Sequence, residues 1–298
     1  MKRCLIANPI AGSATAPDDL REKFQRLEPV DIRVTHAPGE AEKFAREAVA
    51  DGCDMLVVAG GDGTLNEVVN GIAPHAAEVL LALAPSGTGN DFARALNLPD
   101  ALDDCLDLIL SEKIRAVDLV RVQSDRLRYF VNVSAGGFSG LVNEKLTAEM
   151  KQTWGPLAYL RCAAAALPEL RAYRTEITLD NATPIAANLY NVVVANGRYV
   201  AGGIPIAPDA EPDDGLLDVV LIPENSGSDL ALLAAQVVIG THLTSAAIIF
   251  RRAARVTVQS TPGMWFNVDG EIVGNEPAVF EIVPRAIQFV APAKSDKS

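Results

Sequence analysis

Two long apolar runs, each ending in a glycine-rich turn, constrain the fold of this 298-residue chain most strongly. Residues Met55–Ala59 and Val79–Ala84 contain no polar side chain. Such runs are typical of strands that are buried on both faces, as in parallel sheets. Helical stretches follow the turns, over Leu65–Asn70 and Asp91–Leu96. Strands that alternate with helices predict a parallel sheet with right-handed crossovers.

The alternating pattern begins earlier in the chain and stops near Arg115. We expect strands at Cys4–Ala7 and Val30–Thr35, and a helix over Glu40–Ala50. Beyond Arg115 the pattern changes to short strands between turns, with helical stretches at Leu157–Leu167 and Asp229–Ile239. The expected short strands are Val117–Val122, Tyr129–Val133, Thr175–Leu179, Leu189–Val194, Leu217–Leu221, Val256–Gln259 and Val279–Val283. The sequence therefore predicts an α/β domain and, from about residue 123 onward, a second, β-rich domain.

Charge and cysteine content narrow the class of protein. The net charge of −12 argues against a nucleic-acid partner, because phosphates would be repelled, and weakens electrostatic docking on anionic lipid. Any membrane contact should be transient and apolar or locally basic. The four cysteines are scattered, as expected for a reducing cytoplasm. The tract Leu230–Phe250 is interrupted by polar residues, so we expect a packed helix ending near Gly240 rather than a membrane span, and a soluble protein.

The first glycine-rich turn, Gly60–Thr64, suits a phosphate group. Consecutive glycines let the backbone approach a ligand closely, and the amides at the start of the following helix can bind phosphate oxygens. The Asp62 carboxylate would repel phosphates unless a cation lies between them, and nucleotide-bound Mg²⁺ supplies such a cation. Taken alone, the segment fits a plain strand–helix turn with Thr64 as cap equally well.

The second turn, Pro85–Phe92, repeats this design one crossover later. In a parallel sheet both turns emerge at the carboxyl edge, where ligands bind. Asn90 or Asp91 could simply cap the following helix. Other nucleotide fingerprints are missing: Asn66 stands where a dinucleotide-binding loop has glycine, and neither a Walker A motif nor the protein-kinase motifs are present. The two turns together predict a phosphate site.

A series of short motifs runs along the chain: Asn8-Pro9-x-Ala-Gly, Gly61-Asp62-Gly63-Thr64 with Asn66-Glu67, the Ser86–Asp91 loop, Asn132-x-x-Ala-Gly-Gly-Phe, Asn196-Gly197-Arg198, Pro212–Asp218 and Asn267–Glu271. In order and spacing these motifs resemble the diacylglycerol-kinase catalytic-domain family, in particular its bacterial lipid kinases, over nearly the whole chain. The resemblance implies an N-terminal α/β nucleotide-binding domain of the NAD-kinase and phosphofructokinase type and a C-terminal β-sandwich domain. It also implies that residues 286–298 return to the first domain and that the site lies in the cleft between the two domains.

The resemblance also implies roles for single residues. The implied ATP-binding residues are Asn8, Thr35, Gly60, Gly61, Asp62, Gly63, Thr64, Leu65, Asn66, Thr88 and Asp91. Glu271 is implied as the catalytic base that accepts the proton of the acceptor hydroxyl, and Asp62 as the residue that organises Mg²⁺ and the phosphates, with Asp91 in support. From the residues alone, Asp269-Gly270 reads as an ordinary hairpin turn and Glu271 as a solvated residue after it.

A structural cation site is implied as well, formed by the Asp214 carboxylate with the main-chain carbonyls of Glu211 and Leu216. Such all-oxygen sites suit Mg²⁺ or Ca²⁺. From the residues alone this segment is an acidic turn before a strand. The basic run Arg251–Arg255 fits a solvated strand entrance better than a binding site for lipid headgroups. The apolar stretch Leu157–Leu167 fits a packed helix better than an acyl-chain groove.

The sequence thus predicts an ATP- and Mg²⁺-dependent lipid kinase that acts on the hydroxyl of a diacylglycerol, phosphatidylglycerol or similar lipid. Two alternatives stay open, a phosphotransferase that acts on a soluble acceptor as NAD kinase does, and a nucleotide sensor without enzymatic activity. The expected partners are ATP and a membrane lipid, met transiently at the inner face of the membrane, with no nucleic acid. The oligomeric state is open, with a dimer among the alternatives.

Overall fold

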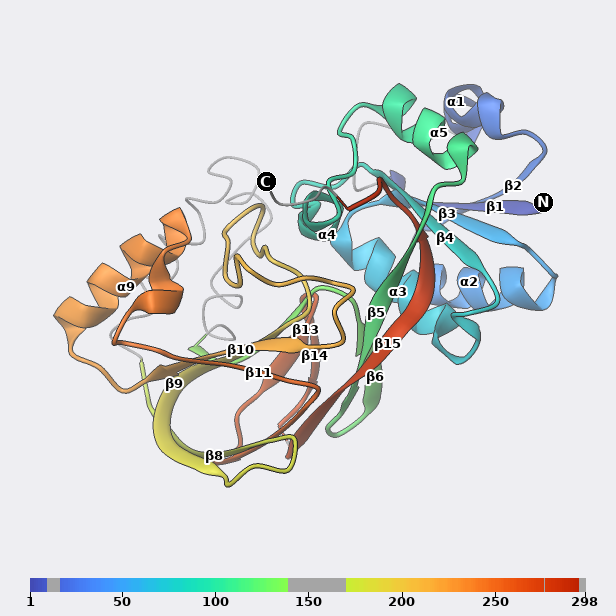
Figure 1. Cartoon of the computed structure of the whole chain (residues 1–298). Helices are drawn as coiled ribbons and strands as arrows, with labels where there is room; N and C mark the ends of the chain where they lie inside the picture. The colour runs from blue at the N-terminus through green and yellow to red at the C-terminus, as the bar shows by residue number, and fades with distance from the viewer. Residues whose placement is uncertain (10–16, 139–169, 276, 295–298) are drawn as a thin grey trace. The chain divides into compact units, whose positions relative to one another are not determined.

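A computed structural model describes residues 1–9, 17–138, 170–275 and 277–294. Two compact units make up the chain (Figure 1). The first unit contains Met1–Leu119 and Pro284–Ser298, and the second contains Val120–Val283. The helix expected at Leu157–Leu167 lies outside the described residues. The expectation of an α/β first part and a β-rich second part is confirmed.

A parallel sheet forms the centre of the first unit. Its strands are β1 (Arg3–Ala7), β2 (Val30–Val34), β3 (Met55–Gly60) and β4 (Leu80–Pro85), in the order β4-β3-β1-β2. The end of β15 (Ala278–Val290) adds to this sheet in parallel with β4, pairing Gln288 with Leu80. Every residue of β3 is buried, as its uninterrupted apolar run predicts.

Helices cover both faces of this sheet (Figure 1). One face carries α1 (Pro17–Phe24), the short η2 (Gln25–Leu27) and α5 (Leu102–Ser111), whose apolar side chains pack on those of β1, β3 and β4. The other carries α2 (Glu40–Ala50) and α3 (Asp62–Ile72), with η3 (Ala73–His75) after α3. Gly71 allows α2 and α3 to pack closely, because a Cβ atom there would lie 2.4 Å from the carbonyl oxygen of Glu42. The short α4 (Asp91–Ala95) follows β4.

The second unit is built from antiparallel strands. Their order is β14-β13-β7-β9-β8-β12-β15, with β10 pairing β9 and β11, and β5 pairing β6. The strands are β5 (Ile114–Gln123), β6 (Leu127–Phe130), β7 (Val133–Gly137), β8 (Tyr173–Leu179), β9 (Ile185–Ala195), β10 (Leu217–Pro223), β11 (Ile249–Ala253), β12 (Arg255–Thr261), β13 (Phe266–Val268) and β14 (Glu271–Gly274). Alternate residues of β9 enter different cores: Val192 and Val194 face one, and Val193 and Ala195 face the other. The central strands are therefore buried on both faces.

The expectation of one strand over Tyr129–Val133 is wrong, because the ladder is interrupted after Phe130. The Val131 carbonyl accepts a hydrogen bond from Asn196 Nδ2 (2.7 Å), and the Asn132 carbonyl accepts from the amide of Asn196 (2.8 Å). These contacts use backbone groups that a continuous strand would pair. The sequence reading also missed α1, α5 and β11, and it predicted the turn of the β13–β14 hairpin without its two strands.

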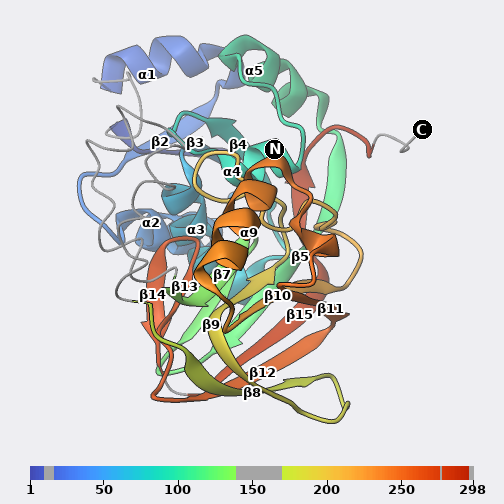
Figure 2. The same ribbon diagram turned by 90° about the vertical axis from the view of Figure 1, so that its left-hand side faces the viewer.

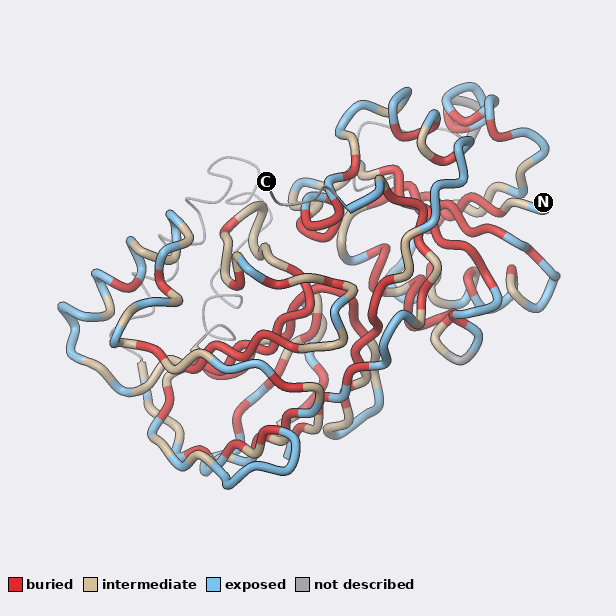
Figure 3. Tube along the Cα trace, in the orientation of Figure 1, coloured by how far each residue is buried: buried red, intermediate tan, exposed pale blue. Residues whose placement is uncertain are grey.

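The helix expected at Asp229–Ile239 is present as α9 (Gly227–Ile239), and it ends at Gly240 in the left-handed conformation. It lies beside β9 and β10 (Figure 2), and Leu233 packs on Val193 and Val220. We expected a packed helix, but only a small part of α9 is packed. Leu233 is the only buried residue of α9, and most of the helix is exposed (Figure 3). No helix in the described part of the chain is long and apolar enough to cross a membrane.

Stability should fall as the pH drops below about 6.5, because His242 in η5 (His242–Thr244) is buried. Burial lowers the pKa of His242 below its usual 6.5, while the hydrogen bond between Nε2 and the Ile206 carbonyl (2.8 Å) opposes that shift. Below pH 6.5 the unfolded chain therefore binds a proton at His242 that the folded chain does not bind. The contribution of neutral His242 to the free energy of unfolding is complete above pH 6.5 and is lost as the pH falls below it. Urea unfolding of His242→Gln should show a weaker dependence on acid pH. The exposed His75→Gln is the control, and equal pH dependence in wild type and His242→Gln would contradict the assignment.

Candidate active site

The order of the parallel strands marks one place in the first unit as the ligand-binding edge. From β1 the chain places β2 on one side, and β3 with β4 on the other. Crevices form outside the carboxyl ends of strands where the strand order reverses in this way. Asn8 follows β1, and its amide donates to the Ala59 carbonyl at the end of β3 (2.9 Å). The predicted turn Gly60–Thr64 therefore begins at the switch point, the place beside β1 where the strand order reverses.

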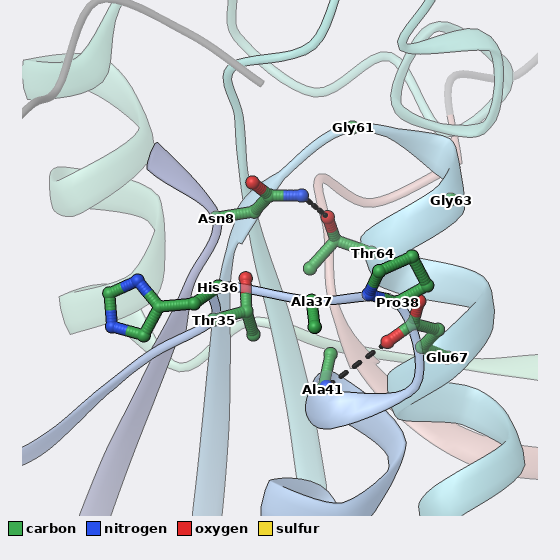
Figure 4. Close-up of a pocket in the computed structure, with 10 residues that line it drawn as sticks. All are labelled: Asn8, Thr35, His36, Ala37, Pro38, Ala41, Gly61, Gly63, Thr64 and Glu67. Atoms are coloured by element: carbon green, nitrogen blue, oxygen red, sulfur yellow. Dashed lines mark hydrogen bonds between the residues drawn. The ribbon is translucent and has the colours of Figure 1, made fainter. Parts of the chain in front are cut away.

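A pocket of about 310 Å³ lies at this edge (Figure 4). It is lined by Asn8, Thr35, His36, Ala37, Pro38, Ala41, Gly61, Gly63, Thr64 and Glu67. Its volume falls at the lower end of the range usual for small-molecule sites. Asn8 Nδ2 donates to Thr64 Oγ1 (3.2 Å), and Thr35 Oγ1 donates to the Ala7 carbonyl (3.3 Å). These bonds hold the ends of β1 and β2 and the start of α3 together around the pocket.

Five of the predicted ATP-binding residues line this one pocket: Asn8, Thr35, Gly61, Gly63 and Thr64. Leu65 and Asn66 are buried in α3 instead and do not line it. Glu67 was not predicted as a site residue, although it stands in the motif beside Asn66. Its carboxylate accepts from the Ala41 amide at the start of α2 (3.1 Å). The segment His36–Pro38 was also missed, and its position directly after Thr35 is the signal that could have found it.

The second glycine loop touches the first. A Cβ atom at Gly87 would lie 2.5 Å from the Cα atom of Gly61, so the two backbones are in direct contact. Asn90, in the left-handed conformation, closes this loop: its Oδ1 accepts from the Gly87 amide (3.0 Å) and its Nδ2 donates to the Gly87 carbonyl (2.8 Å). Asn90 therefore shapes the loop, and its side chain does not cap α4.

Asp62 links the two loops. Its Oδ2 accepts from the amide of Asp91 (3.1 Å), and its Oδ1 accepts from the amide of Phe92 (3.2 Å). The cap of α4 thus comes from the first loop, 29 residues earlier in the chain. The Asp91 carboxylate pairs with Arg94 (3.2 Å). A carboxylate oxygen has two lone pairs, so Asp62 can still accept from a water bound to Mg²⁺ while it holds α4.

Gly87→Ala should lower both stability and nucleotide affinity. The added methyl group would overlap Gly61, so the two loops must separate, which costs about 1–3 kcal/mol of unfolding free energy. Gly227→Ala is the matched control, since a Cβ atom there meets nothing within 4 Å. Urea unfolding and ATP titration measure the two effects. Wild-type stability and ATP affinity in Gly87→Ala would contradict the close contact of the loops.

Glu271 lies in the second unit, directly after the turn that joins β13 and β14. Both turn residues, Asp269 and Gly270, have positive φ (45° and 93°), as in a type I′ hairpin. Asp269 Oδ1 accepts from the Val133 amide (3.0 Å), and the Asp269 amide donates to the Val133 carbonyl (3.0 Å). The hairpin turn expected from Asp269-Gly270 is present, and these bonds fix it to β7.

Two arginines hold the Glu271 carboxylate. Arg126 Nη2 donates to Oε1 (2.8 Å), and Arg128 Nη2 donates to Oε2 (2.6 Å). Glu271 is therefore not the freely solvated residue that the turn alone suggests, although its side chain is 36% exposed. A general base needs a fixed orientation and access to its substrate, and this carboxylate has a fixed orientation and partial exposure. The sequence reading missed Arg126 and Arg128.

The residues of the expected cation site lie together in one turn before β10. Asp214 Oδ1 accepts from the Leu216 amide (3.0 Å), and the Glu211 carbonyl accepts from the Asp214 amide (3.3 Å). The other carboxylate oxygen of Asp214 forms an ion pair with Arg252 Nη2. Carbonyl and carboxylate oxygens are the donors that Mg²⁺ and Ca²⁺ prefer, so the residues fit such an ion. Among the described residues, no group of three or more His, Cys, Asp and Glu side chains forms a metal cluster.

The fold is an α/β unit with a parallel sheet, followed by a β-rich unit. The same fold occurs in an ATP complex of an NAD kinase from Archaeoglobus fulgidus (TM-score 0.52, 14% identity, 97% of this chain and 93% of that one). A structure described as a putative diacylglycerol kinase from Bacillus anthracis is more similar (TM-score 0.81, 26% identity, 98% and 95% covered).

Sequence comparisons agree. Residues 2–122 match the diacylglycerol kinase catalytic domain, and residues 132–291 match the YegS C-terminal NAD kinase beta sandwich-like domain. A diacylglycerol kinase from Staphylococcus aureus is 32% identical over 97% of this chain and 91% of its own length, and one from Staphylococcus haemolyticus is 32% identical over 98% and 89%. The chain belongs to the diacylglycerol kinase family, a family of lipid kinases that use ATP. The resemblance seen in the motifs is confirmed.

Proposed function

We propose that this protein transfers the γ-phosphoryl group of MgATP to the hydroxyl of a glycerolipid. The observation that carries the proposal is the contact between the two glycine loops at the switch point, where Gly61 meets Gly87 and Asp62 caps α4. Backbone amides in a glycine turn that leads into a helix N-terminus suit a phosphate chain, and the Gly60–Thr64 segment leads into α3 in this way. The lipid-kinase family of the chain supports a lipid as acceptor.

Each predicted residue receives one task in this proposal. Asn8, Thr35 and the Gly60–Thr64 segment bind the nucleotide, with Thr88 from the second loop. Asp62 keeps the two loops in register and, supported by Asp91, would hold waters of a bound Mg²⁺. Mg²⁺, when bound, would neutralise charge on the phosphates. Glu271 accepts the proton of the lipid hydroxyl as the new P–O bond forms.

The proposal extends to domains, location and metal. The nucleotide domain comprises residues 1–123 with 286–298, and the lipid domain residues 124–285. The protein works in the cytoplasm and meets the inner face of the membrane transiently. Cys4, Cys53 and Cys105 are free thiols, which suits a reducing compartment. A structural Mg²⁺ or Ca²⁺ is held by the Asp214 carboxylate with the carbonyls of Glu211 and Leu216.

A panel of acceptors tests the proposal. Labelled ATP is offered with mixed micelles of diacylglycerol, phosphatidylglycerol or a sphingoid base, and separately with NAD. Label is expected on one or more of the lipids and not on NAD. Label on NAD alone would favour the soluble-acceptor alternative, and ATP binding without any transfer would favour a nucleotide sensor.

A further inference from the structure

A buried carboxylate, that of Asp218, lies next to the expected cation site. Asp218 on β10 is 1% exposed, and neither of its carboxylate oxygens accepts a hydrogen bond from any described residue. A buried charge of this kind is costly unless it is paired and hydrogen-bonded. Its ion-pair partner is Arg252, whose Nε lies 3.5 Å from Asp218 Oδ1. Within the described part of the chain, Asp218 therefore has a positive charge nearby but no donor at good hydrogen-bond geometry.

The guanidinium group of Arg252 forms ion pairs with two carboxylates, those of Asp214 and Asp218. Arg252 lies directly opposite Asp218 in the register of β10 and β11, and its Nη2 pairs with Asp214. Two negative groups thus share a single positive charge. The Arg252 side chain is 38% exposed, so it can move into solvent without a large rearrangement of the core. The neighbouring Arg251 is exposed and donates to the Phe250 carbonyl (2.7 Å).

We propose that Asp218 belongs to the cation site at Asp214 and that Arg252 is a resident counter-ion, which a divalent cation of the Mg²⁺ or Ca²⁺ class displaces. The inference rests on the structural metal of the proposed function. A divalent ion carries one more positive charge than Arg252, which matches the two carboxylates. Mg²⁺ keeps several of its waters when it binds to proteins, and a metal-bound water can donate to the Asp218 oxygens that Arg252 leaves without a hydrogen bond.

This arrangement predicts opposite effects for two neighbouring substitutions. Arg252→Gln removes the competitor while keeping a polar side chain, so Mg²⁺ alone should bind about tenfold more tightly than to the wild type. Asp218→Asn removes the second carboxylate and should weaken binding by about tenfold, while Asp214→Asn should abolish it. Arg251→Gln, on the same strand, is the matched control and should behave as the wild type.

The measurement is isothermal titration of the full chain with MgCl₂, and separately with CaCl₂, without nucleotide or lipid. Thermal unfolding with and without the metal gives a second readout, since a ligand that binds the folded state raises stability. Equal or weaker binding by Arg252→Gln would show that Arg252 is no competitor. Wild-type affinity in Asp218→Asn would remove Asp218 from the site, and no binding by any variant would overturn the inference as a whole.

A double variant keeps the test valid if Arg252→Gln fails to fold without metal. Arg252→Gln with Asp218→Asn removes the buried charge together with its partner. The double variant should bind Mg²⁺ more tightly than Asp218→Asn alone. Equal affinity of the two variants would show that Arg252 does not compete with the cation. Because ATP and lipid are both absent, the outcome does not depend on kinase activity. Normal lipid phosphorylation without metal binding would reject this inference alone.

Discussion

Glu271→Gln should lower turnover about a thousandfold while the affinity for MgATP stays unchanged, because general-base catalysis contributes about 10²–10⁴-fold. The amide keeps the size of the side chain and can still accept from Arg128 or Arg126, but it cannot take the proton of the acceptor hydroxyl. Steady-state kinetics with lipid micelles give turnover, and titration with ATP gives nucleotide affinity. The expected pattern is a loss in kcat at constant nucleotide binding.

The control for this substitution is Glu281→Gln. Glu281 on β15 belongs to the same unit as Glu271 and also pairs with an arginine, Arg121, at 3.6 Å. It has no role in the proposed reaction, so its variant should keep wild-type turnover. Near-normal turnover in Glu271→Gln would remove Glu271 as the base, whatever the control shows.

Asp62→Asn should have the second largest effect, and it should damage both structure and nucleotide binding. The carboxylate accepts from two amides, those of Asp91 and Phe92. An asparagine has one acceptor oxygen, and its NH₂ group would face the other amide. The loss of one partly buried bond costs about 1–3 kcal/mol of unfolding free energy. Separation of the loops should then weaken ATP binding by about tenfold or more.

Urea unfolding and ATP titration measure these two effects. Asp103→Asn is the control, because the Asp103 side chain on α5 is 90% exposed and its ion pair with Arg26 is long (3.9 Å). A stable Asp62→Asn protein that binds ATP like the wild type would contradict the role of Asp62 in joining the loops. Reduced stability with unchanged ATP affinity would restrict Asp62 to a structural role.

Local pattern was sufficient to predict the parallel sheet and part of its ligand edge. The apolar run Met55–Ala59 predicted a strand buried on both faces, and the structure shows it fully buried as β3. The carboxyl ends of parallel strands share one edge, where the two glycine turns were predicted to emerge. Asn8, Thr35 and Thr64, which the family resemblance implied as ATP-binding residues, line one pocket at that edge.

Long-range contacts could not be read from the sequence. The Asp62 carboxylate holds amides 29 and 30 residues away, and the partners of Glu271 are 145 and 143 residues away. No local spacing encodes such pairs, since they depend on how separate strands meet. The interruption between β6 and β7 has the same origin, because the partner that takes the Val131 carbonyl is Asn196.

Two of the family motifs prove to hold the second unit together. A Cβ atom at Gly197 would lie 2.0 Å from Asn132 Oδ1, so the close approach of these segments requires glycine there. Asn132 Nδ2 donates to the Tyr199 carbonyl (3.0 Å), which ties the start of β7 to the loop after β9. Arg198 continues this connection through its ion pair with Glu211 (2.9 Å). The motif therefore supports the turn that carries Asp214.

The most direct test of the central claim is the initial rate of phosphate transfer from labelled ATP as the mole fraction of lipid in detergent micelles is raised. The proposed function predicts a rate that rises with the lipid fraction, label on a lipid hydroxyl, no label on NAD, and loss of the signal in Glu271→Gln. A rate that is independent of lipid, or one that Glu271→Gln retains, would contradict the assignment of this chain as a lipid kinase with Glu271 as its base.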